Sequence, residues 1–371
     1  MQRSIYIRPL GIYAARQGAA SPEAPQEIWG GLPLAGGPLA FSALEVLERA
    51  PGGTVRRTIG LGDLFERDWG RNTLAASDLI EAIRVPRSRL AGLSLDRPRI
   101  MGIVNVTPDS FSDGGQHGGA AGAIAHGLKL VAEGADILDV GGESTRPGSD
   151  YVPAEDELRR VMPVIEGLRA KTDALISIDT RKAEVMRRAE QAGADILNDV
   201  SALTHDPDAL EVAVESGLPV MLMHAQGDPK TMNDNPQYSD VVLDVFDFLE
   251  QRVRACVAAG IPKSRLVADP GIGFGKHLHH NVAVLNAMSL YHGLGVPVLL
   301  GASRKKLIGQ LCNVEDPKAR VPGSLAAALH SIAQGVQIVR VHDVRETRQA
   351  VAVWEAAQAG SETAIGGPQA P

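Results

Sequence analysis

The chain has 371 residues, of which 44% are hydrophobic and 22% charged, and its formal net charge is -7. This composition excludes disordered and fibrous proteins and indicates a soluble globular protein with a large core. Lys and Arg are scattered rather than clustered, so we expect no nucleic-acid partner. No stretch approaches the roughly 20 apolar residues of a membrane span, and the first residues lack the apolar part of a secretory signal. We therefore expect a cytoplasmic protein that does not enter a membrane.

Residues 1–97 differ in character from the rest of the chain. They contain Gly- and Pro-rich patches and short amphipathic pieces at residues 44–47 and 79–83. No motif in this region carries chemistry, so we interpret it as an N-terminal extension or small subdomain of unknown role.

From residue 98 onward, short β-branched runs alternate with helical patterns. Near-continuous apolar strands separated by helices predict a parallel sheet covered by those helices. Eight such units up to residue 358 predict a (β/α)8 TIM barrel in the α/β class, with an open doubly wound sheet as the alternative. Residues 359–371 are typical of a disordered tail. The expected strands are 100–104, 136–140, 175–178, 196–197, 219–223, 266–268, 297–300 and 338–341.

Polar side chains follow several of these runs, and Asp179, Asn198 and Asp269 are prominent among them. The carboxyl ends of TIM-barrel strands form the active site, so we expect these residues to face one cavity. A buried carboxylate needs a partner. A planar heterocycle with adjacent amino and N–H groups would pair with it through two parallel hydrogen bonds. Metal ligation is an alternative use, and capping of the following helix is an alternative for Asp179.

A glycine-rich loop, Asp269-Pro-Gly-Ile-Gly-Phe-Gly-Lys276, follows the sixth run. Its glycine spacing fits neither common phosphate-binding motif, so a tight turn is the alternative to a phosphate cradle. Phe274, held between glycines, could provide a wall for a flat substrate.

Cations end the last two runs, as Ser303-Arg304-Lys305-Lys306 and as Arg340 and His342. Residues at i and i+2 of a strand share a face, so Arg340 and His342 should project together. Such cations suit an anionic leaving group. Salt bridges to Glu143 or Asp343 are the structural alternative, and a Schiff-base aldolase that uses Lys305 is the mechanistic one.

Taken together, these motifs resemble the dihydropteroate synthases of folate biosynthesis over about residues 98–358. The stretches that carry the resemblance are 101–115, 139–148, 177–180, 198–201, 222–224, 269–276, 303–305 and 340–342.

The resemblance implies an alkyl transferase. It would condense 6-hydroxymethyl-7,8-dihydropterin diphosphate with 4-aminobenzoate, with Mg²⁺ on the diphosphate, to give 7,8-dihydropteroate and pyrophosphate. It also implies sensitivity to sulfonamides and a homodimer formed through barrel helices.

By the same resemblance, the pterin pocket comprises Asp179, Asn198, Met223, Asp269 and Lys305, with Arg340 over the ring. Asn105 is the Mg²⁺ ligand, and His342 binds the diphosphate. Phe274 and Lys305 lie near the aminobenzoate. The mobile-loop residues implied by the resemblance are Asp109 and Asp113 on a first loop and Thr145, Arg146 and Pro147 on a second.

The residues to which we assign catalytic roles on this basis are Asp113, Arg146 and Lys305. Asp113 would stabilise a developing cation, whereas Asp109 has the alternative of only capping its own turn. Lys306 stands where the family has a small hydroxyl residue, which leaves sulfonamide sensitivity open. The alternatives within the family's fold are a pterin-binding paralogue without synthase activity and a methyltetrahydrofolate-dependent methyltransferase domain.

Overall fold

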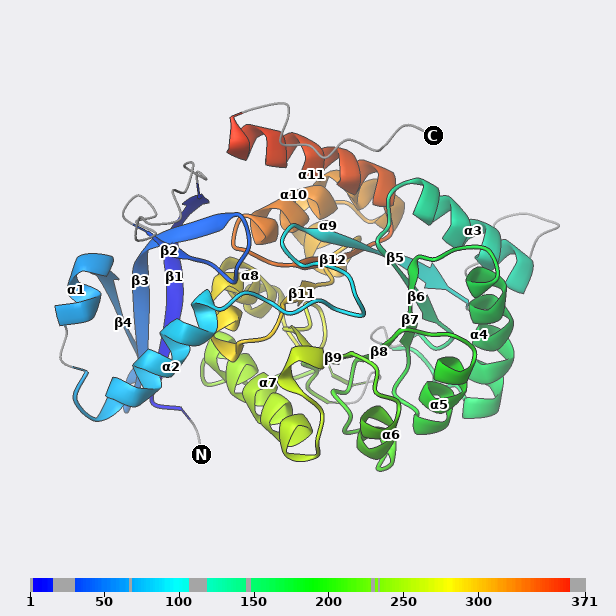
Figure 1. The fold of residues 1–371 in the computed structure, drawn as a ribbon, viewed down its shortest axis with the longest axis horizontal. Coiled ribbons are helices and arrows are strands. Elements are labelled where there is room, and N and C mark those ends of the chain that lie inside the picture. The colour runs from blue at the N-terminus through cyan, green and yellow to red at the C-terminus, as the bar shows by residue number, and fades with distance from the viewer. Residues whose placement is uncertain are drawn as a thin grey trace.

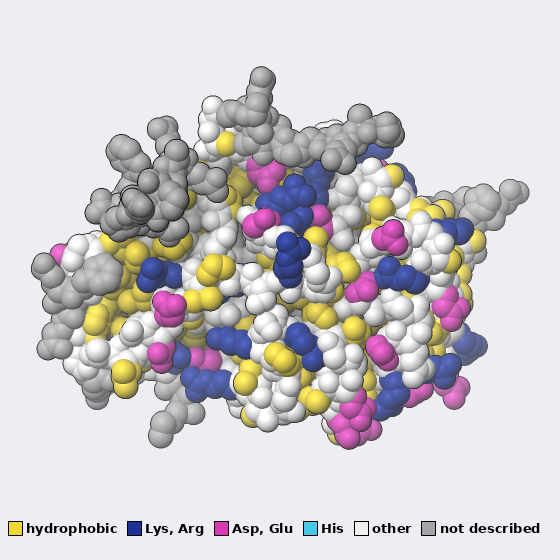
Figure 2. Space-filling model, in the orientation of Figure 1, with side chains coloured by type: hydrophobic (Ala, Val, Ile, Leu, Met, Phe, Trp, Pro, Cys, Tyr) yellow, Lys and Arg dark blue, Asp and Glu magenta, His cyan; other side chains and the backbone are white. Residues whose placement is uncertain are grey.

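The computed structural model describes residues 3–15, 31–66, 69–106, 119–144, 148–227, 231–232 and 234–360. The larger part of this chain is a barrel of parallel strands, and a smaller antiparallel sheet lies beside it (Figure 1). Among the described residues, no helix is long and apolar enough to cross a membrane. Acidic and basic side chains are interspersed over the face shown in Figure 2.

The barrel has eight strands in the order β10-β9-β8-β7-β6-β5-β12-β11. A parallel bridge between Ala268 of β10 and Val298, just before β11, brings the two ends of this order together. The predicted TIM barrel is therefore confirmed, and the open doubly wound sheet is wrong. The strands are β5 (Arg99–Asn105), β6 (Ile137–Gly141), β7 (Leu175–Asp179), β8 (Ile196–Asp199), β9 (Val220–Met223), β10 (Leu266–Asp269), β11 (Leu299–Leu300) and β12 (Ile338–Val341).

Helices cover the outside of this barrel, as the sequence pattern predicts (Figure 1). The last of them ends at Ala359, one residue into the expected tail, and residues 361–371 lie outside the described part of the chain. The helices are α3 (Ala120–Ala132), α4 (Ala154–Arg169), α5 (Ala183–Gln191), α6 (Ala209–Glu215), α7 (Val241–Ala258), α8 (Leu278–Asn286), α9 (Lys306–Cys312), α10 (Val321–Ile332) and α11 (Val344–Ala359).

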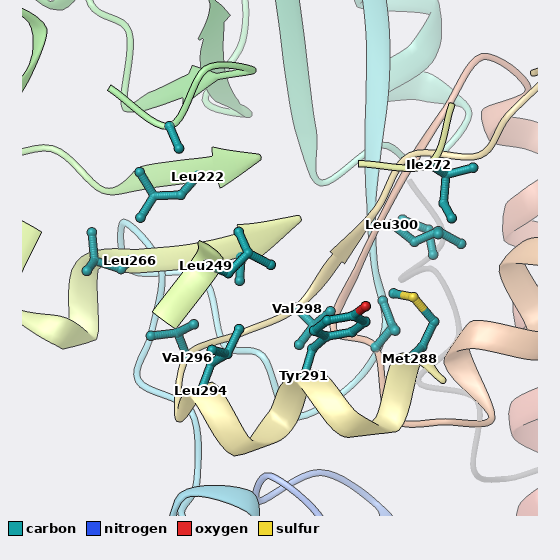
Figure 3. Close-up of a cluster of buried hydrophobic side chains, with 14 of the residues drawn as sticks. Leu222, Leu249, Leu266, Ile272, Met288, Tyr291, Leu294, Val296, Val298 and Leu300 are labelled. Carbon is teal, nitrogen blue, oxygen red and sulfur yellow. The ribbon is translucent and has the colours of Figure 1, made fainter. Parts of the chain in front are cut away.

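Strand side chains alternate between the barrel interior and the helices, because successive residues of a strand point to opposite faces. The outward set packs under the helices, and Figure 3 shows part of this cluster, which includes Leu222, Leu266 and Leu300 from the strands, Leu249 of α7 and Tyr291 of the 3-10 helix η4 (Met288–Leu294). A separate interior cluster forms the floor of the barrel. Its strand residues are Met101, Ile137, Ile196, Met221, Val267, Leu299 and Ile338.

Leu90 and Leu95 complete this floor cluster. They belong to the segment just before β5, and a short antiparallel bridge between Leu90 and Leu93 shapes it. The end of the expected N-terminal extension thus plugs the amino-terminal end of the barrel, so chemistry is left to the opposite end.

The N-terminal sheet contains β1 (Ile5–Ala14), β2 (Leu32–Pro33), β3 (Leu39–Ala50) and β4 (Gly53–Gly60), with β3 paired antiparallel to the other strands. Helices α1 (Leu61–Glu66) and α2 (Thr73–Arg84) follow it. Charged contacts fix the sheet to α7: Arg49 lies 2.8 Å from Asp244 and 2.9 Å from Asp247, and the Tyr6 hydroxyl donates to Asp247 at 2.7 Å. The N-terminal sheet is therefore packed on the barrel.

The contact between α2 and η4 gives a test of this packing. Leu79 is 1% exposed and lies close to Gly293 of η4, whereas Leu74 on the same helix is 80% exposed. We expect Leu79→Ala to lower the free energy of unfolding by about 2 to 5 kcal/mol, because it leaves a cavity. Leu74→Ala should change it by less than about 0.5 kcal/mol. Chemical denaturation measures both, and equal effects would show that α2 is not docked.

Candidate active site

The predicted rim residues converge at the carboxyl end of the barrel. Gly301 marks the point of convergence: a methyl group built on it would lie 3.8 Å from Oδ2 of Asp269, 3.8 Å from Nζ of Lys305 and 3.9 Å from Cδ of Arg340. Asp179 of β7 and Asn198 of β8 are register partners on neighbouring strands. The structure thus brings the predicted residues of five strand ends around one space above the apolar floor.

Arg340 lies between two carboxylates. Its Nε donates to Asp139 at 2.6 Å and its Nη2 to Asp179 at 2.8 Å. Burial by itself lowers the pKa of Arg340, but Asp139 and Asp179 outweigh it, so the pKa lies above its ordinary value. The interpretation of Asp179 as a helix cap is wrong, since the first helical N–H of α5, that of Ala183, donates to Asp206 instead.

Burial raises the pKa of Asp179 to about 7, although Arg340 acts to lower it and the Asp139 charge raises it further. This carboxyl can therefore change protonation state near neutral pH. A ligand that donates hydrogen bonds would favour the ionised form.

Asn198 presents its amide to the same cluster. It is 7% exposed, and its Nδ2 donates to both oxygens of Asp139 at 3.3 Å. Because the amino end of the amide is occupied in this way, the carbonyl oxygen is the end available to a ligand.

Asp269 and Lys305 form the other side of the space. Asp269 accepts from the N–H of Gly271 at 2.7 Å, and burial raises its pKa, an effect that Lys305 opposes. Lys305 donates to the carbonyl oxygen of Ile272 at 2.5 Å and lies 4.6 Å from the centre of the Phe274 ring. The Phe274 ring therefore lies against the Lys305 ammonium group.

The glycine loop is a tight turn rather than a phosphate cradle. Lys276 is 3% exposed, and its Nζ donates to the carbonyl oxygens of Gly271 and Phe274 at 2.8 and 3.1 Å, so the loop binds its own lysine. Gly271 has φ +68°, and a side chain there would meet the His224 carbonyl oxygen at 1.9 Å. The loop is thus pressed against the chain after β9, and this contact holds Asp269 in place.

The outer rim carries further cations. Arg304 forms an ion pair with Asp343, so the salt-bridge interpretation holds for Arg304. The His342 Nδ1 lies 3.0 Å from the Ser303 hydroxyl. Lys306 is exposed at the start of α9, one position beyond Lys305.

Asn105 ends β5 next to Gly141 of β6 and is half-buried. The residues that the structure describes contain no group of three or more His, Cys, Asp or Glu side chains that could hold a metal ion. An amide oxygen at the rim does fit Mg²⁺, since this ion usually takes one or two protein oxygens and completes its shell with phosphate and water. Asp109, Asp113, Thr145, Arg146 and Pro147 lie outside the described residues.

A buried ion network stands beside the site. Glu143, just after β6, pairs with Arg181 at 3.1 Å and with Lys182 at 2.7 Å, and Lys182 also reaches Glu157 of α4 at 2.5 Å. Glu143 further accepts from the N–H of Val152 at 3.1 Å. The network therefore joins the segments after β6 and β7 to α4.

Sequence reasoning missed Asp139, Gly301 and this network. Asp139 had a usable signal, because it is a charged residue inside an apolar run, with Ile137 and Gly141 at the spacing that shares its face. Gly301 had no such signal. The Glu157–Lys182 pair had none either, because it joins α4 to the segment after β7, 25 residues later in the sequence.

The barrel is similar in sequence to known pterin-binding enzymes. The sequence pattern of the family described as "Pterin binding enzyme" matches residues 101–342. The dihydropteroate synthase of Escherichia coli K12 is 49% identical over 270 residues, which are 73% of this chain and 95% of that protein. The Neisseria meningitidis serogroup B enzyme is 51% identical over 71% of this chain and 94% of its own length.

Solved structures of dihydropteroate synthases are also similar to this chain. The Xanthomonas albilineans dihydropteroate synthase with 4-aminobenzoic acid has a TM-score of 0.70 and 54% identity, covering 74% of this chain and 98% of that one. The same enzyme in complex with 7,8-dihydropteroate has a TM-score of 0.67 and 51% identity, covering 74% and 99%. The Yersinia pestis enzyme in a sulfonamide complex has a TM-score of 0.69 and 48% identity, covering 72% and 96%. The N-terminal sheet lies outside the range of the family match.

Gly271 of the glycine loop and Gly217, just after α6, provide a matched pair of variants. Gly271 and Gly217 have φ +68° and +69°, but a side chain at Gly217 meets nothing within 4 Å. Gly217→Ala should cost about 1 to 2 kcal/mol of stability from backbone strain alone. Gly271→Ala should cost roughly a further 1 to 3 kcal/mol, because the loop must move. Denaturation curves compare the two, and an equal loss would mean that the loop does not press on His224.

The buried network gives a second test. Lys182→Met should destabilise the protein by about 3 to 5 kcal/mol, because Glu143 and Glu157 lose their shared cation. Exposed Lys171→Met is the control, with a change below about 0.5 kcal/mol. Removing the cation raises the folded-state pKa of both carboxyls relative to wild type, and burial already holds that of Glu157 above its ordinary value. The deficit should therefore be smaller at pH 5 than at pH 8; a deficit independent of pH would contradict this assignment.

Proposed function

We infer that this barrel makes 7,8-dihydropteroate, since the chain belongs to the dihydropteroate synthase family of pterin-binding enzymes. The reaction condenses 6-hydroxymethyl-7,8-dihydropterin diphosphate with 4-aminobenzoate and releases pyrophosphate. The observation that carries this conclusion is the set of acceptors at the ends of β7, β8 and β10, Asp179, Asn198 and Asp269, in a chain of this family.

The acceptors match the head of a pterin, which presents adjacent amino and N–H donors in one plane. Asp269 can take two of these donors in parallel, and the Asn198 carbonyl oxygen can take another. Met223, 4% exposed at the end of β9, lines the pocket, and Arg340 covers the ring. A ligand of this kind supplies the hydrogen bonds that the buried carboxylates need.

The diphosphate would lie at the cationic rim, near Lys305, His342 and Ser303. Asn105 would hold Mg²⁺ together with the phosphate oxygens. When bound, this ion supplies charge that stabilises the departing pyrophosphate.

The order of bond changes follows from the substrates. The bond between the pterin methylene carbon and the pyrophosphate oxygen breaks first, and the amine nitrogen of 4-aminobenzoate then attacks the resulting cation and loses a proton. An amine that attacks a carbocation needs no strong base. We assign Asp113 to stabilise that cation and Thr145, Arg146 and Pro147, with Phe274 and Lys305, to the aminobenzoate, on the family resemblance.

The competing functions have less support. Lys305 lies beside Asp269 and donates to a backbone carbonyl, an arrangement that favours an ammonium ion over a Schiff-base nucleophile. The relatives compared above are synthases, which disfavours a pterin-binding paralogue and a methyltransferase domain.

Assembly and location also remain proposals. We propose a homodimer through barrel helices other than α7, because the N-terminal sheet occupies that side. The free thiols of Cys256 and Cys312 are consistent with a reducing cytoplasm. Sulfonamides should compete with 4-aminobenzoate, and the exposed Lys306 distinguishes that subsite from the family pattern.

A single assay tests the activity. Purified protein with the pterin diphosphate, 4-aminobenzoate and Mg²⁺ should release pyrophosphate and dihydropteroate in equal amounts. Omission of 4-aminobenzoate is the control for simple hydrolysis. If no dihydropteroate forms at micromolar enzyme concentration, the proposed function is wrong.

Two variants separate the roles of the carboxylates. Asp269→Ala should abolish pterin binding, because it removes the paired acceptor of the pterin head. Asp113→Ala should lower turnover far more than pterin affinity, because its charge acts on the cation. Calorimetry with 6-hydroxymethylpterin and steady-state kinetics give the two quantities, and identical behaviour of both variants would contradict the assignment.

A further inference from the structure

Asp139 is a buried carboxylate to which the reaction itself assigns no part. It is 0% exposed, in the middle of β6, one inward position below Gly141. Its cross-strand partner on β7 is Ser177, whereas Asp179 pairs with Gly141. Asp139 therefore lies one layer deeper than the strand-end residues, beneath the space that a pterin would fill.

From this position Asp139 holds two of the proposed pterin contacts. Its Oδ2 accepts from Arg340 Nε at 2.6 Å, and both oxygens accept from Asn198 Nδ2 at 3.3 Å. Gly141 leaves the room above it, since a side chain there would meet Asp179 Cβ at 3.4 Å. The carboxylate thus connects β8 to β12 below the ligand.

Charge balance alone does not explain Asp139. Arg340 already pairs with Asp179 at 2.8 Å, so a second fully buried carboxylate adds a like charge to the cluster. A buried charge is costly unless its hydrogen bonds are complete. Asp139 accepts its hydrogen bonds from Arg340 and Asn198, and the orientation of these two side chains would decide how a pterin is recognised.

The two ends of the Asn198 amide have nearly the same shape, so its hydrogen bonds set its orientation. With Nδ2 on Asp139, the carbonyl oxygen faces the space and accepts a ligand N–H. Without Asp139, Nδ2 can turn to Asp179, its cross-strand neighbour. The Asn198 amide would then no longer present its carbonyl oxygen to the N–H donors of the pterin.

We propose that Asp139 is the positioning residue of the pterin site: it orients the Asn198 amide as an acceptor and fixes the plane of the Arg340 guanidinium over the ring. This inference rests on the proposed function. Asp139 itself does not touch the substrate.

The test compares Asp139→Asn with wild type in the full-length protein, using 6-hydroxymethylpterin as the probe. Asp139→Asn should weaken pterin binding by roughly 10-fold to 100-fold, because it loses charge-assisted hydrogen bonds to both groups. The KM for 4-aminobenzoate should not change. Asp195→Asn is the control: Asp195 also pairs with an arginine, Arg169, and accepts from the backbone N–H of Ile176, but it precedes β8 at the opposite end of the barrel, so this variant should keep wild-type pterin affinity.

The pH dependence of pterin binding is a second measurement. If Asp139 had only a structural role, its replacement would leave this pH dependence unchanged. The charged groups that act on Asp179 are Arg340 of β12, Asp139 of β6, Asp199 of β8 and Glu157 of α4. Loss of the Asp139 charge lowers the pKa of Asp179. The midpoint for pterin binding should therefore move to lower pH in Asp139→Asn, by about one unit.

The outcomes are distinct. If wild-type protein does not bind the pterin, the proposed function fails. If it binds and Asp139→Asn binds equally well with an unchanged midpoint, this inference is overturned.

If Asp139→Asn does not fold, an apolar replacement of the pair provides the test, because such replacements often retain stability. Asp139→Leu combined with Arg340→Met should bind pterin more weakly than Arg340→Met alone, since only the double variant loses control of Asn198. Equal affinities would contradict the proposal.

Discussion

The site depends on the alternation of side chains along barrel strands. Each strand directs every second residue inward, and register between neighbours aligns these residues in layers. Ile137, Ile196 and Val267 belong to the floor. The inward residues above it are Asn198 on β8 and Asp269 on β10, whereas β6 places Asp139 between Ile137 and its strand-end residue Gly141. A change from apolar to polar at the upper inward position therefore converts a packed core into a binding surface without altering the barrel. The plug formed by Leu90 and Leu95 leaves the other end closed.

Charge pairing organises the polar layer. Arg340 joins Asp139 to Asp179, and Lys305 balances Asp269 on the opposite side. The three carboxylates outnumber these two cations, and burial raises the pKa of Asp179 and of Asp269. A ligand edge rich in N–H donors completes the arrangement. Rigid supports outside the layer, the Lys276-bound glycine loop and the Glu143 network, limit how far these groups can move.

Local sequence predicted the barrel and much of its site because both follow from short-range patterns. The eight strands were found from β-branched runs, and Asp179, Asn198, Asp269 and Arg340 from the polar residues at or near their ends. Contacts between distant segments left no such pattern. The Lys182–Glu157 pair and the docking of Arg49 on α7 depend on the final packing. The N-terminal sheet was missed because Ile5, Tyr6 and Ile7 are buried in succession, so its first strand shows no alternation.

A structure of the protein bound to 7,8-dihydropteroate tests the central claim most directly. The pterin edge should lie within hydrogen-bonding distance of Asp269 and of the Asn198 carbonyl oxygen, with Arg340 over the ring and the aminobenzoate portion toward Phe274. A product molecule bound away from these strand ends, or with its amino edge turned from Asp269, would contradict it.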